Sequence, residues 1–343
     1  MGKNKKEITV HDDVRHRFKM AGRPAAPLVI CNNVIPRNVL RAVQCIPKDI
    51  YAEMSDDRRW LTWLAERRLI RNTSTCANCR GPMSLVRRAE SPDAFSWKCR
   101  HCGTRTSIRT GSFFANCGLT TQTIVMMMYY WVYEVKATHV MMFESINNWH
   151  TTVNYNNFFR LECRNWFLNQ HVQLGGFDFN GVSMYVEVDE TYYFHRKYHR
   201  GRYRRGTWVV GVVERASGKC WLEVIARRNA ATLERIISDH VLPGSIVVTD
   251  AWRGYTNVGT IQNGVYQHET VVHARNFVDV TDPDMHTQTI EGLWMHAKRK
   301  VRYQSGTSRA LFTSYLHAFQ WHYSHKRHVF GAYLHLLADN YNI

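Results

Sequence analysis

Residues 186–191 read Val-Glu-Val-Asp-Glu-Thr, a β-branched run that ends in acidic side chains, and this stretch decides the fold that we expect. A second run of the same kind, residues 246–250, reads Ile-Val-Val-Thr-Asp. Each run predicts a buried strand that ends in one aspartate, Asp189 or Asp250. A third carboxylate, Glu291, falls in the first turn of a predicted helix whose second half is basic.

Three carboxylates delivered in this way are typical of a divalent-metal site. Mg²⁺ and Mn²⁺ prefer oxygen ligands and retain several waters, so a few carboxylates and the phosphates of a substrate can hold them. Two ions about 4 Å apart can then stabilise the attacking and the leaving oxygen of an in-line displacement. We therefore predict that Asp189, Asp250 and Glu291 are catalytic metal ligands, although either aspartate alone could be an ordinary turn residue.

The order of the predicted elements around these carboxylates favours one fold class. We expect strands near residues 185–188, 208–214 and 220–226, a helix over 231–241, strands near 245–249 and 269–273, and a helix from 289 or 290. This order is that of a ribonuclease-H-like α/β domain, a mixed sheet flanked by helices, which we assign to residues 178–300. The first and fourth strands of such a sheet are neighbours, so Asp189 and Asp250 should face the helix that carries Glu291. Residues 301–343 read as C-terminal helices that pack on this domain.

The composition points to a polyanionic partner. The chain has 343 residues, a net charge of +17 and a pI near 9.6, and 45% of its residues are hydrophobic, which is enough for two or three folded domains. Its longest strictly apolar run, Ile124–Tyr133, is ten residues long and too short to span a bilayer. We therefore expect a soluble, nucleic-acid-binding protein without a membrane partner.

Four of the nine cysteines form two Cys-x-x-Cys pairs, Cys76 with Cys79 and Cys99 with Cys102. This spacing predicts a structural Zn²⁺ site that closes a ribbon over residues 71–118. An odd number of cysteines makes a disulfide framework a poor explanation, and four buried free thiols are the remaining alternative. The region before the ribbon, residues 1–70, reads as a small, partly helical N-terminal region.

Residues 119–177 have helical periodicity and could bind DNA. Thr120 or Thr121 can cap a first helix, and we expect helices over 124–135, over 137–146 and from residue 151 or 152 onwards. A short helix, a turn and a longer helix resemble a helix-turn-helix, in which Arg160 and Arg164 are candidate DNA contacts. The alternative is a plain helical linker with a solvated face.

The loop of residues 195–205 is the densest positive charge in the chain. Because it follows the first predicted catalytic strand, we expect it to contact the DNA backbone beside the metal site. The candidate DNA contacts in this loop and in the last catalytic helix are Arg196, Lys197, Arg200, Arg202, Arg204, Arg205 and Lys298. Three further residues are possible accessory groups of the site: Glu187, His273 and His286.

These motifs, taken in order, resemble those of the Merlin superfamily of eukaryotic DDE transposases, which are relatives of bacterial insertion-sequence transposases. The resemblance covers about residues 75–325. It rests on the four-cysteine ribbon, Arg109-Thr110-Gly111-Ser112-Phe113-Phe114, residues 186–191, Lys197-Tyr198-His199-Arg200-Gly201-Arg202, Gly206-Thr207-Trp208-Val209-Val210-Gly211, Thr249-Asp250-Ala251-Trp252-Arg253-Gly254-Tyr255 and His286-Thr287-Gln288-Thr289-Ile290-Glu291.

The resemblance implies that Asp189, Asp250 and Glu291 are the DDE triad and that Mg²⁺ or Mn²⁺ is the cofactor. It implies double-stranded DNA as substrate, namely the terminal inverted repeats of a mobile element and a target. Water would nick the element ends, and the freed 3′-hydroxyl would attack the target DNA. Pairing two ends implies a homodimer or a higher oligomer, and a eukaryotic element implies a nuclear location.

Two other functions fit the same residues. A domesticated descendant would bind DNA through the ribbon and the helices without cutting it, and a ribonuclease-H-like nuclease or resolvase would use the same carboxylates on branched or hybrid substrates. A zinc-ribbon transcription factor is a poorer interpretation, because it would not need the catalytic architecture after residue 178.

Overall fold

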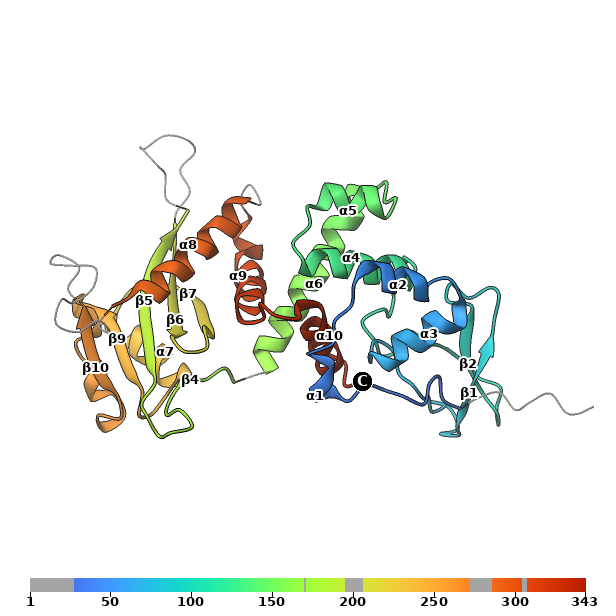
Figure 1. The fold of residues 1–343 in the computed structure, drawn as a ribbon, viewed down its shortest axis with the longest axis horizontal. Helices are drawn as coiled ribbons and strands as arrows, with labels where there is room; N and C mark the ends of the chain where they lie inside the picture. The colour runs from blue at the N-terminus through green and yellow to red at the C-terminus, as the bar shows by residue number, and fades with distance from the viewer. Residues whose placement is uncertain (1–27, 170, 195–205, 272–285, 304–306) are drawn as a thin grey trace, which may run out of the picture.

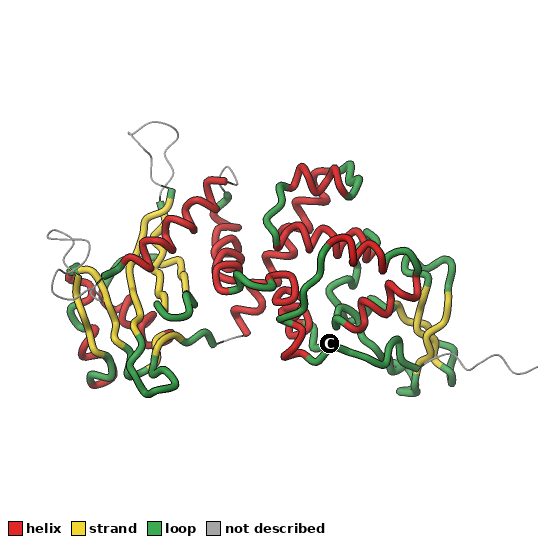
Figure 2. The backbone as a smooth tube through the Cα atoms, in the orientation of Figure 1, coloured by secondary structure: helices red, strands yellow, loops and turns green. Residues whose placement is uncertain are grey.

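The computed structural model describes residues 28–169, 171–194, 206–271, 286–303 and 307–343. The described chain is elongated, with a five-stranded sheet at one end, a small ribbon at the other and a group of helices between them (Figure 1). Coloured by secondary structure, the larger groups of strands gather at the two ends and the helices fill the middle (Figure 2). None of the helices that the structure describes has the length and apolar composition that a membrane span needs.

The five-stranded sheet is mixed and has the order β10-β9-β5-β6-β7. Strands β5, β6 and β7 form an antiparallel meander, whereas β9 runs parallel to both β5 and β10. The predicted neighbourhood of the first and fourth strands, β5 and β9, is therefore confirmed. The strands are β5 (Tyr185–Tyr193), β6 (Thr207–Glu214), β7 (Cys220–Ile225), β9 (Ile246–Asp250) and β10 (Gln267–Val271).

Helices cover both faces of this sheet. Helix α7 (Ala230–His240) and the 3₁₀ turns η2 (Arg253–Tyr255) and η3 (Val258–Asn263) pack on one face, where Val186 and Val188 are buried. Helices α8 (Gln288–Tyr303) and α9 (Arg309–Ser324) pack on the other face. Because successive side chains of a strand point to opposite faces, the acidic residues of β5 divide between the two layers.

Strand β5 is longer than the sequence predicts. It continues past Asp189 to Tyr193, which pairs with Thr207 of β6, so Asp189 lies inside a strand and not at its end. The residues after Asp189 include Thr191 and two tyrosines, which favour strand conformation. Asp250, by contrast, is the last residue of β9, as predicted.

The N-terminal region and the ribbon lie at the far end of the molecule from the large sheet (Figure 1). Asp56 caps helix α3 by accepting hydrogen bonds from the backbone amides of Arg58 and Arg59. The three ribbon strands are antiparallel in the order β1-β2-β3. The elements of this end are α1 (Arg37–Leu40), α2 (Pro47–Glu53), α3 (Asp57–Glu66), β1 (Met83–Arg87), β2 (Phe95–Cys99) and β3 (Arg105–Ser107).

The predicted helices of the middle region are present: α4 (Thr121–Val132), α5 (Ala137–Phe143) and α6 (Trp149–Asn169). Thr120 caps α4 through the amide of Thr123, as expected. The long α6 packs against α4, α9 and α10 and is the central helix of this group. Two short strands, β4 (Leu174–Gly175) and β8 (Val241–Leu242), pair in parallel where the chain enters the sheet domain.

The two C-terminal helices pack on different parts of the molecule. The prediction that both pack on the catalytic domain is therefore wrong for the second helix. Helix α9 contacts β7 and α8, but α10 (Val329–Asn340) packs against α1, α4 and α6. Most side chains of α10 are buried in the hydrophobic core that the N-terminal half forms. Gly331 lets α1 and the chain after it approach closely, since a Cβ atom there would lie 2.4 Å from the carbonyl oxygen of Val43.

Candidate active site

Asp189 and Asp250 lie on neighbouring strands and on one face of the sheet. Glu187 of β5 pairs with Val248 of β9, and this parallel register, continued by two residues, sets Asp189 level with Asp250. Residues that lie level in neighbouring strands point to the same face. The Asp250 carboxylate also accepts the backbone N–H of Trp252 at 3.0 Å, which holds the side chain at the end of its strand.

Electrostatics agree with this juxtaposition. Burial raises the pKa of Asp189 to about 6, and the neighbouring Glu190 and Asp250 carboxylates add to the shift. The ionised form of Asp189 is therefore destabilised by low polarity and by like charge, and a nearby cation would relieve both. A carboxylate in this state, with a second one level with it, suits a hard divalent ion.

Helix α8 crosses one face of the large sheet (Figure 1). The indole N–H of Trp294 donates to Asp189 Oδ2 at 2.9 Å. Gly211, the β6 residue opposite Asp189, makes room for this ring, because a Cβ atom there would lie 2.6 Å from the Trp294 side chain. Lys298, one turn further along α8, lies 5.9 Å from the Tyr193 ring centroid and feels the charge of Asp189.

Glu291 is exposed in the first turn of α8 and belongs to the same helical stripe as Trp294 and Lys298. The stripe therefore runs past Asp189. Among the described residues, however, only the four ribbon cysteines bring three or more ligand atoms within 4.8 Å of one another. Asp189, Asp250 and Glu291 do not form such a cluster among the described residues.

Glu187 fixes the start of α8. Its side chain is fully buried, and its Oε2 accepts the backbone N–H of Ile290 at 2.8 Å. Its Oε1 pairs with Arg215 Nε at 2.6 Å, and Arg215 also donates to the His286 carbonyl oxygen. A carboxylate at a helix N-terminus is stabilised by the unpaired amides there. Glu187 thus lies on the Asp189 face, as predicted, and secures the helix that carries Glu291.

Glu190 points to the opposite face, also as predicted, and holds the chain that follows Asp250. Its carboxylate accepts hydrogen bonds from Arg228 and from the buried Tyr255 hydroxyl. The Arg228 guanidinium lies 3.8 Å from the ring centroid of Trp252, the residue whose amide binds Asp250. The contacts of Glu187 on one face of β5 and of Glu190 on the other thus hold the elements around Asp189 and Asp250 in place.

The four predicted zinc ligands come together in the ribbon. Cys76 Sγ lies 3.5 Å from Cys102 Sγ, and Cys79 Sγ lies 3.3 Å from Cys99 Sγ. Tetrahedral zinc with bonds of about 2.3 Å to sulfur needs a set of four thiolates this compact. The cluster fits a structural Zn²⁺ site.

The predicted DNA contacts occupy different environments. Arg164 is exposed on α6, whereas Arg160 is buried and stacks on Tyr315 of α9, so Arg160 is not on the open face of its helix. His286 lies at the start of α8, where its Nδ1 is 3.5 Å from Glu187 Oε1. The basic loop 195–205 and His273 lie outside the described residues.

The sequence analysis assigned no role to the residues that support the aspartates, although two of them belong to the motifs quoted for the resemblance. These residues are Gly211, Arg215, Arg228, Tyr255 and Trp294. One signal was available, because a buried strand that carries Glu187 and Glu190 must find cationic or hydrogen-bonding partners. Which arginines supply them depends on the packing of distant elements.

The fold and the site together define a mixed α/β protein with two aspartates on neighbouring strands of its sheet. Residues 180–324 match the family model described as the ISXO2-like transposase domain. An uncharacterized transposase-like protein of Haemophilus influenzae is 28% identical over 106 residues, which are 31% of this chain and 81% of that protein. Both similarities support a transposase.

Solved structures add little. A chain in the cryo-EM structure of the simian T-cell lymphotropic virus intasome in complex with PP2A regulatory subunit B56 gamma is 12% identical. The alignment covers 56% of this chain and 66% of that chain, with a TM-score of 0.28. A TM-score this low supports no inference.

Proposed function

We propose that this chain is a DDE transposase with a ribonuclease-H-like catalytic domain, which cuts the ends of a mobile element and joins them to target DNA. One observation carries the proposal: β5 and β9 are parallel neighbours, with a register that, continued by two residues, sets Asp189 level with Asp250 within the segment that matches a transposase domain. The strand order β10-β9-β5-β6-β7, with α8 across one face, supports the ribonuclease-H-like assignment.

The chain's own residues have distinct roles in this proposal. Asp189, Asp250 and Glu291 would hold Mg²⁺ or Mn²⁺, which when bound would polarise the scissile phosphate and activate the attacking oxygen. Trp294 orients the Asp189 carboxylate through its N–H. Lys298, on the same stripe of α8, would neutralise charge on the DNA phosphates.

The remaining regions would recognise DNA. The zinc-stabilised ribbon and helices α4, α5 and α6 would bind the terminal inverted repeats, and Arg164 together with the basic loop would contact phosphates. The chain would then resemble Merlin elements more closely than bacterial ones and act in a nucleus. Two copies would hold two DNA ends, and size measurement of the end-bound complex tests this, because a monomer that holds both ends would contradict it.

Cleavage of element-end DNA tests the proposal. Purified protein and its Asp189→Asn, Asp250→Asn and Glu291→Gln variants are incubated with end DNA and Mg²⁺, and end nicking and strand joining are scored. We expect each variant to lose more than about 100-fold in rate while it still binds the DNA. Asp239→Asn is the matched control, since Asp239 is an exposed carboxylate of α7 that pairs with Arg235.

Tight DNA binding without cleavage by any protein would favour a non-cleaving DNA-binding protein. Cleavage restricted to branched or hybrid substrates would favour a nuclease or resolvase. Metal-dependent end cleavage that survives Asp250→Asn would contradict the assignment of the site.

A further inference from the structure

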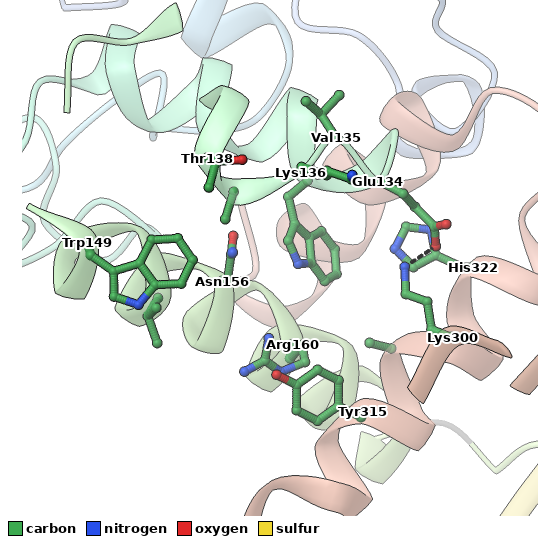
Figure 3. A pocket seen from close by; sticks show the side chains of 14 residues that line it. Glu134, Val135, Lys136, Thr138, Trp149, Asn156, Arg160, Lys300, Tyr315 and His322 are labelled. Atoms are coloured by element: carbon green, nitrogen blue, oxygen red, sulfur yellow. Dashed lines mark hydrogen bonds and ion pairs between the residues drawn. The ribbon is translucent and has the colours of Figure 1, made fainter. Parts of the chain in front are cut away.

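A cavity of about 570 Å³ lies between the helical group and the helices that cover the large sheet. Its walls come from the turn between α4 and α5, from α6, and from α8 and α9, and the polar and aromatic side chains surround one space (Figure 3). A cavity of this size suits a small ligand or one residue of a polymer. The lining residues that matter most are Glu134, Lys136, Trp149, Asn156, Arg160 and Lys300.

Arg160 at the base of this cavity lacks the partners that a buried arginine usually has. The residue is 5% exposed, and its guanidinium carbon lies 4.0 Å from the ring centroid of Tyr315. It donates to Asn157 Oδ1, but its Nε has no hydrogen-bond partner, and no ion pair with a carboxylate is found for it among the described residues. Burying an uncompensated charge costs several kcal/mol.

Arg109 shows how the same chain compensates an arginine that is only structural. It is 6% exposed, and it makes two bonds of 2.7 Å to the Asp93 carboxylate. It also donates to the carbonyl oxygens of Cys117 and Leu119. Compared with Arg109, Arg160 keeps donor capacity and positive charge that an anion could satisfy.

The rest of the lining strengthens the preference for an anion. Lys136 and Lys300 also line the cavity, and Glu134, which pairs with Lys300, is the one carboxylate among the described lining residues. Burial lowers the pKa of His322 to about 4, so that imidazole is neutral at pH 7. Cations therefore outnumber carboxylates, as at sites that bind phosphate.

An aromatic side chain stands at the cavity rim. Trp149, the first residue of α6, is 48% exposed, so much of its indole is open to a second ring. A nucleobase gains binding energy when it stacks on an exposed aromatic ring. A phosphate donor at the base and an open ring at the rim match the two chemical parts of a nucleotide.

We propose that this cavity binds one unpaired nucleotide of the DNA substrate, with its phosphate on Arg160 and its base on Trp149. The identity of the ligand as DNA rests on the proposed function. Lys300 belongs to the same helix as Glu291 and lies nine residues further along, which corresponds to about 13 Å. That length spans about four base-pair steps, so the unpaired nucleotide would lie only a few positions from the reacting phosphate.

The test compares binding of two fluorescent DNA hairpins, one blunt and one with a short single-stranded oligothymidylate tail. It uses the Asp189→Asn background without divalent metal other than the bound zinc, so that no DNA is cut. We expect the tail to strengthen binding about 10-fold or more. Arg160→Gln and Trp149→Ala should each remove this gain, so that each variant binds the two hairpins with affinities within about 2-fold of one another.

Phe158→Ala is the matched control, because Phe158 is 46% exposed on the same helix but does not line the cavity. If Arg160→Gln does not fold, Trp149→Ala and Lys136→Ala carry the test. Equal binding of both hairpins, or a tail effect that survives both Trp149→Ala and Lys136→Ala, would overturn the proposal. Binding is measured without cleavage. The nucleotide site can therefore be confirmed in a protein that does not cut DNA, and it can be refuted in one that does.

Discussion

At the residue scale, the protonation of Asp189 couples the site to stability. Its pKa is raised to about 6 from 3.8, so between these values the folded chain binds more protons than the unfolded chain. The free energy of unfolding therefore falls as pH rises through this window, by up to about 3 kcal/mol. The Asp189→Asn variant still offers an acceptor to Trp294. Without metal, this variant should therefore be more stable than the wild-type protein at pH 8.

Thermal or denaturant unfolding of wild type and Asp189→Asn from pH 4 to pH 8 measures this coupling. We expect the difference in stability to grow with pH and to level off above about pH 7. Asp239→Asn, which removes an exposed carboxylate of α7, is measured beside it as the control. A difference that is independent of pH would contradict the burial of a charged Asp189.

Glu187 is the second residue whose removal should be informative. Glu187→Gln leaves the partly buried Arg215 without its carboxylate and weakens the hold on Ile290, so we expect a loss of about 3–5 kcal/mol in unfolding free energy. Because α8 then loses its anchor, the cleavage rate should fall more than DNA affinity. Glu223→Gln, which breaks the more exposed pair with Arg235, should cost less than about 1 kcal/mol.

At the element scale, contact between α8 and β6 depends on one glycine. Gly211→Val would force Trp294 off β6 and away from Asp189, so we expect at least a 10-fold loss of cleavage and a lower melting temperature. Trp294→Phe should keep most of the packing and lose the indole N–H donor. Similar melting temperatures for Gly211→Val and wild type would show that α8 does not pack on β6 as described.

The ribbon should depend on its cysteine cluster. Cys76→Ser should lose bound zinc and make residues 71–118 sensitive to protease, because structural zinc supplies the folding energy of such small segments. Cys117→Ser is the matched control, since Cys117 is partly buried and lies outside the cluster. Zinc content by elemental analysis and limited proteolysis measure both effects, and full zinc content in Cys76→Ser protein would refute the assignment.

Most helices and strands could be predicted from the sequence, but the elements against which each of them packs could not. The β-branched runs and the turn residues between them give the strands, and Thr120 gives the start of α4. The length of β5 was underestimated because acidic residues interrupt its apolar pattern. The direction in which α10 packs has no local signal, since an element that is apolar on all sides can be buried anywhere.

The residues of the candidate site likewise fall into a group that the sequence predicts and a group that it does not. Asp189, Asp250 and Glu187 could be assigned to one face by strand alternation and strand order. Arg228 and Tyr255 bind Glu190 on the opposite face of the sheet from Asp189. They come from separate elements, and only tertiary packing places them beside Glu190. The burial of Arg160 against α9 likewise depends on how the C-terminal helices return to the middle of the molecule.

At the scale of the whole molecule, the net charge of +17 should govern binding to DNA. The logarithm of the association constant should fall linearly with the logarithm of salt concentration, by about 0.9 for each phosphate neutralised. Replacing Arg204 and Arg205 with alanine should reduce this slope by about 2. Binding titrations over a salt series measure it, and an unchanged slope would show that these two arginines make no backbone contact.

We propose above that Asp189 and Asp250, with Glu291 on α8, hold the metal that DNA cleavage needs. Anomalous X-ray scattering from crystals of the DNA-bound protein soaked in Mn²⁺ tests this most directly. We expect a manganese peak between the Asp189 and Asp250 carboxylates in the wild-type protein and its loss in Asp250→Asn. Manganese bound elsewhere, or a peak that persists in Asp250→Asn, would contradict this site.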